Sequence, residues 1–178
     1  IYHKFGYDQA VSRASDSLSY VYRLDEKYWL MMLDSCICEP VHETGGKLSE
    51  ETVAWMKTQL EEAKKQGVTV IPVSHHNLLD ESTLYPEECT IENTKEVTAL
   101  LETYGVPVYL SGHLHLQRIK KHTSNLNTPG GYGIREIVTS PLPMAPCQYS
   151  ILNWQADGSL SYHTKKVDIA GWAQRYGE

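Results

Sequence analysis

One structural unit is predicted twice in this chain: an amphipathic helix, a glycine, a short apolar strand and a turn that carries histidine. The two copies occupy residues 49–77 and 93–115. Alternation of helical and strand patterns favours an α/β or α+β fold, in which helices cover the outer face of a mixed sheet. Such folds commonly bind ligands at one edge of the sheet, beyond the strand ends. We therefore expect both histidine turns at the same edge.

Sequence signals place both ends of each helix. Ser49 and Asn93 are predicted N-caps, the second in a capping box with Glu96. Gly67 and Gly105 follow the last helical residues, where glycine is the preferred stop. Apolar residues at helical spacing predict the buried faces, which are Val53, Met56, Leu60 and Ala63 in the first helix and Val97, Leu100, Leu101 and Tyr104 in the second.

Strand patterns fill most of the remaining chain. Two apolar and aromatic segments at 19–24 and 28–34 are separated by a polar turn, which predicts a hairpin. Three further segments are rich in strand-forming residues, and they lie at 134–139, 148–154 and 159–167. The predicted fold class is therefore α/β (α+β), with a mixed sheet flanked by helices.

The histidines at the two strand ends predict a metal site. Neutral imidazole is the commonest protein ligand for zinc and similar divalent metals. In extended backbone His113 and His115 would project to the same side, about 6–7 Å apart along the strand. That separation suits two metal ions, each taking one histidine, and His75 would supply a third imidazole. The alternative, that these histidines are ordinary polar residues of the strands and bind no ligand, stays open.

The two histidine turns also carry a family resemblance. Ser74-His75-His76-Asn77 and Gly112-His113-Leu114-His115 resemble the last two metal motifs of calcineurin-like metallophosphoesterases. The resemblance extends over nearly the whole chain. Its flanking segments are Leu33-Asp34-Ser35 and Gly46-Lys47-Leu48, and Phe5-Gly6-Tyr7-Asp8 and Ser17-Leu18-Ser19-Tyr20 are similar to the bacterial branch related to cyclic-nucleotide phosphodiesterases.

The resemblance implies a dimetal hydrolase. His75 and His113 would bind one divalent ion and His115 the other, the ions being Mn, Fe or Zn. The two ions would activate a water that attacks a small phosphoester, either a phosphodiester such as a cyclic nucleotide or a phosphomonoester. His76 would be a catalytic residue in contact with substrate, or would fix a ligand ring from behind; we favour the second role.

The other ligand motifs of that family do not occur in this sequence. It has no Asp-x-His, no Gly-Asp and no Gly-Asn-His. We therefore expect residues 1–178 to be the C-terminal portion of a metallophosphoesterase domain, with the N-terminal half upstream, and we expect this chain alone to be inactive. Half of a β-sandwich exposes an apolar sheet face, which predicts association with the missing half or self-association.

Charge and hydropathy narrow the alternatives. The net charge of −6 argues against binding to a nucleic-acid backbone, and the chain has no apolar run of the roughly 18 residues that cross a bilayer. The compartment stays open between cytoplasmic and exported, because a signal peptide would lie upstream. Two other functions are kept: a non-catalytic metal-binding or interaction module of the same fold, and a β-rich binding domain with incidental histidines.

Overall fold

The protein is built on one seven-stranded sheet, with a separate two-stranded hairpin. The computed structural model describes residues 6–38, 40–80, 86–122 and 133–177. The strand order in the large sheet is β1-β2-β3-β4-β5-β7-β6. Its strands are β1 (Ser12–Arg13), β2 (Tyr20–Arg23), β3 (Tyr28–Leu33), β4 (Thr69–Ser74), β5 (Val108–Ser111), β6 (Arg118–Lys121) and β7 (Arg135–Val138).

The large sheet is mixed, as predicted. Strands β3, β4, β5 and β7 run parallel, whereas β1, β2 and β3 pair antiparallel at one side and β6 pairs antiparallel with β7 at the other. The hairpin of β2 and β3 was expected from the sequence. Because β4 and β5 are adjacent and parallel, with Val73 opposite Leu110, their carboxyl ends lie side by side. This arrangement brings the two histidine turns to one edge of the sheet.

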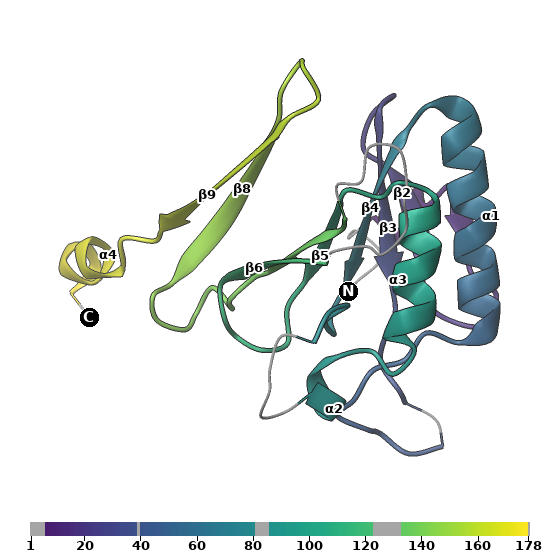
Figure 1. Ribbon diagram of the computed structural model, residues 1–178. Coiled ribbons are helices and arrows are strands. Elements are labelled where there is room, and N and C mark those ends of the chain that lie inside the picture. The colour runs from purple at the N-terminus through teal and green to yellow at the C-terminus, as the bar shows by residue number, and fades with distance from the viewer. Residues whose placement is uncertain (1–5, 39, 81–85, 123–132, 178) are drawn as a thin grey trace.

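Two helices cover one face of the sheet, which we call the helix-covered face (Figure 1). They are α1 and α3, and a continuous core lies between them and the strands. All four apolar residues predicted for the buried stripe of α1 are buried. The helical elements are the 3-10 helix η2 (Tyr7–Gln9), α1 (Glu50–Gln66), α2 (Pro86–Cys89), α3 (Thr94–Thr103) and α4 (Ile169–Tyr176). Within the described residues, none of these helices is long and apolar enough to cross a membrane.

The start of α1 follows its sequence signals, but the start of α3 does not. The Ser49 side chain accepts a hydrogen bond from the Thr52 amide, as an N-cap should. The Asn93 side chain makes no cap hydrogen bond. It binds the main chain of Leu48 instead, accepting from its amide at 3.2 Å and donating to its carbonyl at 2.9 Å, although its amide also reaches Glu96. An asparagine amide can satisfy a donor and an acceptor together, and a loop distant in sequence supplies both.

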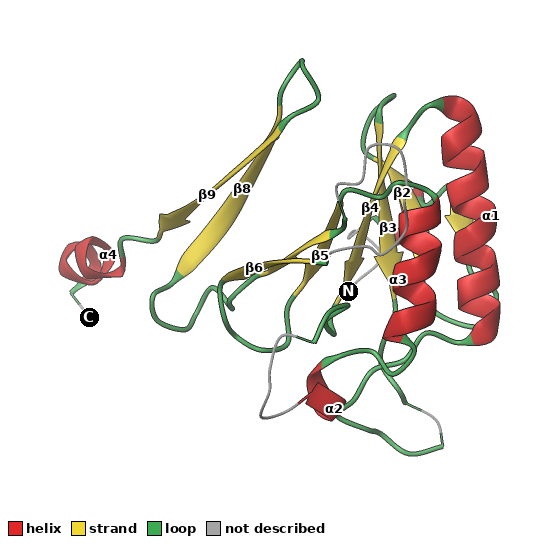
Figure 2. Cartoon of the chain, viewed as in Figure 1, coloured by secondary structure: helices red, strands yellow, loops and turns green. Residues whose placement is uncertain are grey.

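The opposite face of the sheet, which we call the open face, is covered among the described residues only by the hairpin of β8 and β9 (Figure 2). The hairpin strands are β8 (Gln148–Trp154) and β9 (Leu160–Lys166). Its side chains pack on a small cluster whose buried members are Ile71, Val108 and Ile137. Among the described residues from 141 onward, no side chain is fully buried. The open face is therefore much less protected from solvent than the helix-covered face.

Several elements were not predicted from the sequence, among them η2, β1, α2, β6 and α4. Strand β6 has the sequence Arg-Ile-Lys-Lys, which lacks an apolar run, and it lies at the edge of the sheet. Helix α4 is short and contributes no buried residue, although its aspartate N-cap, Asp168, accepts a hydrogen bond from the Gly171 amide. Strand β6 forms by pairing with β7, and α4 is a short helix that begins at a cap. Neither sequence therefore shows a long periodic pattern of apolar residues.

Candidate metal centre

The two histidine turns meet at the carboxyl ends of β4 and β5. The amide of Gly112 donates a hydrogen bond to the carbonyl of His75 at 3.0 Å, which joins the two turns directly. Asn77 adds a second link, because its side-chain amide donates to the Ser111 hydroxyl and to the Gly112 carbonyl. The strand ends therefore place both turns in contact, as expected from their order in the sequence.

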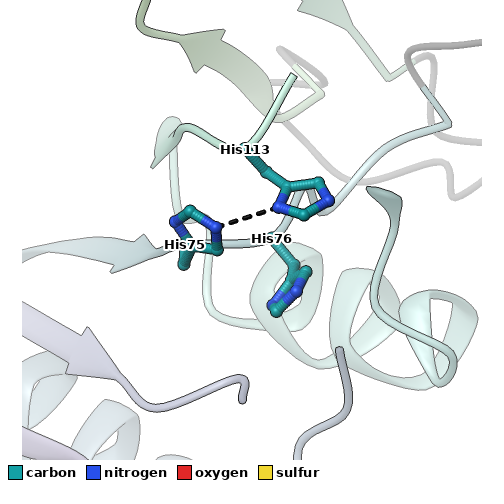
Figure 3. Close-up of side chains that lie close together, drawn as sticks. All are labelled: His75, His76 and His113. Carbon is teal, nitrogen blue, oxygen red and sulfur yellow. Dashed lines mark hydrogen bonds between the residues drawn. The ribbon is translucent and has the colours of Figure 1, made fainter. Parts of the chain in front are cut away.

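Three imidazole rings gather at this point. The ligand atoms of His75, His76 and His113 all lie within 4.8 Å of one another. His75 Nε2 and His113 Nδ1 are 2.9 Å apart, which is a hydrogen-bond distance, so one of the two nitrogens carries the proton between them. Figure 3 shows these two rings turned toward each other, with His76 beside them. In the part of the chain that the structure describes, no carboxylate joins this group.

The pair formed by His75 and His113 fits a metal ion. Two histidine nitrogens on one tetrahedral zinc ion lie about 3.3 Å apart, given zinc–nitrogen distances of about 2.0–2.1 Å. The observed separation of 2.9 Å is only slightly shorter. Loss of solvation lowers the pKa of His75, and the neighbouring His113 and His115 rings lower it further. These effects favour neutral imidazole, which is the form that binds metals.

His76 lies in the same group, but the protein already occupies both of its ring nitrogens. Nδ1 lies 2.8 Å from the Ser35 hydroxyl and Nε2 lies 3.0 Å from the Thr44 carbonyl. A carbonyl only accepts, so Nε2 carries the proton and Nδ1 accepts from Ser35. The side chain is 3% exposed. Gly46 packs on the ring so closely that a Cβ at this position would lie 2.4 Å from it. His76 is therefore held as part of the wall behind His75 and His113.

The backbone of the second turn differs from the extended segment expected from the sequence. His113 has φ 61° and His115 has φ 55°, both in the left-handed region. Alternate residues project to the same side only in extended backbone, so the prediction of an extended segment at His113 and His115 was wrong. Left-handed backbone is uncommon outside glycine, although histidine tolerates it better than most residues. Strained conformations of this kind cluster at functional sites.

Of the four predicted site residues, the structure brings together three. His75, His76 and His113 form the group, and His115 lies outside it with an exposed side chain. His115 is still near enough for its charge to act on His75. The left-handed backbone explains why His115 lies apart from the other three, because side chains in such a turn point in different directions from those in an extended strand.

Sequence reasoning missed the buried carboxylate of Glu136 beneath this edge. Glu136 lies in β7 and is 0% exposed. It accepts hydrogen bonds from the amides of Leu78 and Leu79 at 2.7 and 2.6 Å, and from the Ser111 hydroxyl at 2.5 Å. The only sequence signal was a glutamate inside an apolar strand, where an unpaired charge is strongly disfavoured.

Comparison with known proteins identifies the fold. No protein-family model matches the sequence, and no curated protein matches it. Among solved structures, a dimetal phosphatase from Danio rerio is similar, with a TM-score of 0.54 and 14% sequence identity over 72% of this chain. Over that part of its length, the chain shares the fold of this dimetal phosphatase. It spans about half of the phosphatase, 52% of that chain.

A second solved structure is more distant. It is a protein provisionally described as a 5′-nucleotidase from Staphylococcus aureus, determined in complex with alpha-ketoglutarate. The TM-score is 0.45 and the identity 12%, over 89% of this chain and 32% of that one. At this level of similarity the match adds nothing to the argument about the site.

Proposed function

We propose that this chain carries part of the metal centre of a metal-dependent phosphoester hydrolase. The observation that supports the proposal most directly is the pair of His75 and His113, whose ring nitrogens lie 2.9 Å apart at the carboxyl edge of a metallophosphoesterase-like sheet. A bound divalent cation would stabilise phosphate charge and lower the pKa of a water, which is the chemistry that phosphoester hydrolysis needs.

The residues have distinct proposed roles. His75 and His113 would hold one divalent ion and His115 would bind the second; Mn, Fe or Zn would suit such ligands. His76 keeps its proton on Nε2 and supports the loop at Thr44, so we assign it to shaping the site. We prefer this supporting role to the alternative, in which His76 contacts the substrate directly as a catalytic residue.

The complete site requires ligands that the described residues do not provide. The histidine group lacks a carboxylate in the ranges that the structure describes, and a catalytic zinc site normally takes three protein ligands where His75 and His113 supply two. We propose that an N-terminal portion of the same domain supplies them and that the chain of 178 residues is inactive alone. The substrate is a small phosphoester, with a phosphodiester such as a cyclic nucleotide preferred over a phosphomonoester.

Zinc binding to the purified chain tests the proposal, measured by calorimetry and by elemental analysis after dialysis. We expect His75→Ala and His113→Ala each to weaken binding by more than about 100-fold, because loss of an outer hydrogen-bond partner alone typically costs about 10- to 100-fold. His163→Ala is the matched control, because His163 is exposed on β9 and far along the chain from the site. Equal affinities in all three variants would show that the histidines are incidental.

A non-catalytic metal-binding module is the second candidate. Within the described residues no carboxylate joins the histidines, which favours this module, because a two-histidine site can hold an ion without assembling a hydrolytic centre. Hydrolysis of bis-p-nitrophenyl phosphate separates the two functions when the chain is assayed with and without an added N-terminal portion. Zinc binding without hydrolysis in both assays would support the module and contradict the hydrolase.

We also propose that the open face of the sheet takes up a further protein layer. Tyr28 and Leu30 of β3 and Leu110 of β5 are only half-buried there. Association with an N-terminal portion or with a second copy would remove this apolar area from water. Sedimentation velocity across the micromolar range measures the effect, and a chain that stays monomeric throughout would argue against self-association.

A further inference from the structure

The carboxylate of Glu136 lies where the two histidine turns approach each other. Glu136 pairs with Tyr109 of the neighbouring strand β5, and both side chains are completely buried. Burying an ionised carboxylate is costly unless hydrogen-bond donors surround it. Three donors of Glu136, the amides of Leu78 and Leu79 and the Ser111 hydroxyl, come from outside its own strand, so the fold has to bring them there.

These donors belong to both histidine turns. The Leu78 and Leu79 amides follow directly on the first turn, and the Ser111 hydroxyl directly precedes the second. One oxygen, Oε1, accepts from Leu78 and Ser111 together, and Oε2 accepts from Leu79. A single buried group thus joins both turns, and it keeps these three hydrogen bonds only when both turns are in place.

We propose that Glu136 is a positioning residue that fixes the relative placement of His75 and His113. It acts through the two amides that follow the first turn and the Ser111 hydroxyl that precedes the second. A shift of either turn would leave a buried carboxylate short of donors, so the native arrangement is favoured over alternatives. The expected effect of Glu136 on metal binding rests on the proposed function, whereas its effect on the placement of the two rings is independent of that function.

The substitution Glu136→Gln tests this role with almost no change of shape. An amide has one oxygen and one NH₂ group where the carboxylate has two oxygens. Whichever way the glutamine side chain is oriented, the amide of Leu78 or that of Leu79 then faces an NH₂ group and loses its acceptor. Leu60→Ala is the control, because Leu60 lies in the core under α1 and its loss lowers stability without touching either turn.

Two measurements separate positioning from general stability. The first is the nuclear Overhauser effect between the His75 and His113 rings in the metal-free chain. We expect Glu136→Gln to abolish this ring-to-ring effect, while the nuclear Overhauser effects between β4 and β5 persist. We expect Leu60→Ala to retain the ring-to-ring effect. The second is zinc affinity, where we expect a loss of about 10- to 100-fold in Glu136→Gln and less than about twofold in Leu60→Ala. An unchanged ring contact in folded Glu136→Gln would overturn the proposal.

A measurement on the unmodified chain decides the question if Glu136→Gln does not fold. The amides of Leu78 and Leu79 lie beyond the end of β4, where loop amides normally exchange quickly. Because Glu136 accepts from both, we expect them to exchange as slowly as the amides of the central strands. Rapid exchange at both positions would contradict a fixed turn and overturn the proposal.

The outcomes also distinguish this inference from the proposed function. If the unmodified chain binds no zinc, the metal centre is wrong, while the ring contact and the amide exchange still decide the role of Glu136. If the chain binds zinc and Glu136→Gln binds it equally well with the ring contact intact, the positioning role is wrong and the metal centre stands.

Discussion

The two faces of the large sheet differ in how they are protected. Side chains of β3 alternate between them: Trp29, Met31 and Leu33 are buried under α1 and α3, while Tyr28 and Leu30 on the open face are only half-buried. The helix-covered core is one continuous cluster, whereas the described part of the open face has three buried apolar residues and a hairpin across them.

The candidate site is anchored to the better-packed side. Leu78 and Leu79, which follow the first histidine turn, belong to the helix-covered core, and so does Leu48 in the loop next to Gly46. The histidine turns can therefore keep their geometry even though the other face is incompletely covered. The proposed metal ligands therefore lie at the edge of the sheet, and the proposed association surface lies in a separate region, on the open face.

A matched pair of truncations gives the largest expected effect and tests the comparison directly. Leu60→Ala on the helix-covered face should lower the free energy of unfolding by about 2–5 kcal/mol, because it leaves a cavity in a closely packed core. Leu152→Ala in the hairpin should cost about 1 kcal/mol, because that side chain is half-exposed already. Denaturant titration measures both, and equal losses would mean that the two faces are equally important for stability.

Gly46→Ala should have the next largest effect. A Cβ at Gly46 would lie 2.4 Å from the His76 ring, so the loop or the ring must move, at a cost of about 1–3 kcal/mol. Gly112→Ala is the control, since the nearest atom to its added Cβ is 3.7 Å away. Chemical denaturation of both variants measures the difference, and a Gly46→Ala chain as stable as Gly112→Ala would refute close packing at His76.

Tyr109→Phe should have a smaller effect, confined to the helix-covered side. The Tyr109 hydroxyl donates to Ser74 at 2.7 Å, and Ser74 donates to the carbonyl of His76. Complete burial raises the pKa of Tyr109, so the hydroxyl stays protonated and donates throughout the accessible pH range. Its removal should cost about 1 kcal/mol in thermal or denaturant unfolding. An unchanged free energy of unfolding in Tyr109→Phe would show that Ser74 keeps its position without the Tyr109 hydroxyl.

The smallest expected effect is a pH dependence of stability in the metal-free chain. Burial lowers the pKa of His76, although the hydrogen bond to Thr44 acts in the opposite direction. The unfolded state therefore binds more protons than the folded state below a pH of about 6.5, and stability falls as the pH drops through that range. Unfolding followed from pH 5 to pH 8 measures the slope. His76→Gln should flatten it, and an unaltered slope in that variant would assign the effect to other groups.

Local features of the fold were predictable, whereas long-range ones were not. The N-cap at Ser49, the stop at Gly67 and the buried stripe of α1 depend on neighbours within one or two turns, and all three were confirmed. The partner of Asn93 is the main chain of Leu48, 45 residues away, and no local pattern indicates it. Strand β6 is defined by its pairing with β7 more than by its own residues.

The candidate site shows the same division. The order of strands and histidines was enough to predict that His75 and His113 would meet, because parallel neighbours share an edge. The left-handed backbone at His113 and His115 was not predictable, since the residue types there also suit extended strand. The role of Glu136 depends on donors 25 and about 58 residues away, which only the folded chain brings together.

The two edge strands of the large sheet determine how it can grow. β1 has only two residues, and β6 presents Arg118, Lys120 and Lys121 along the other edge. Short strands and rows of cationic side chains disfavour pairing with a strand from another molecule. A further layer is therefore expected to stack on the sheet instead of lengthening it. Association of this chain should then produce assemblies of limited size, and not the indefinitely extending ladders from which amyloid fibrils are built.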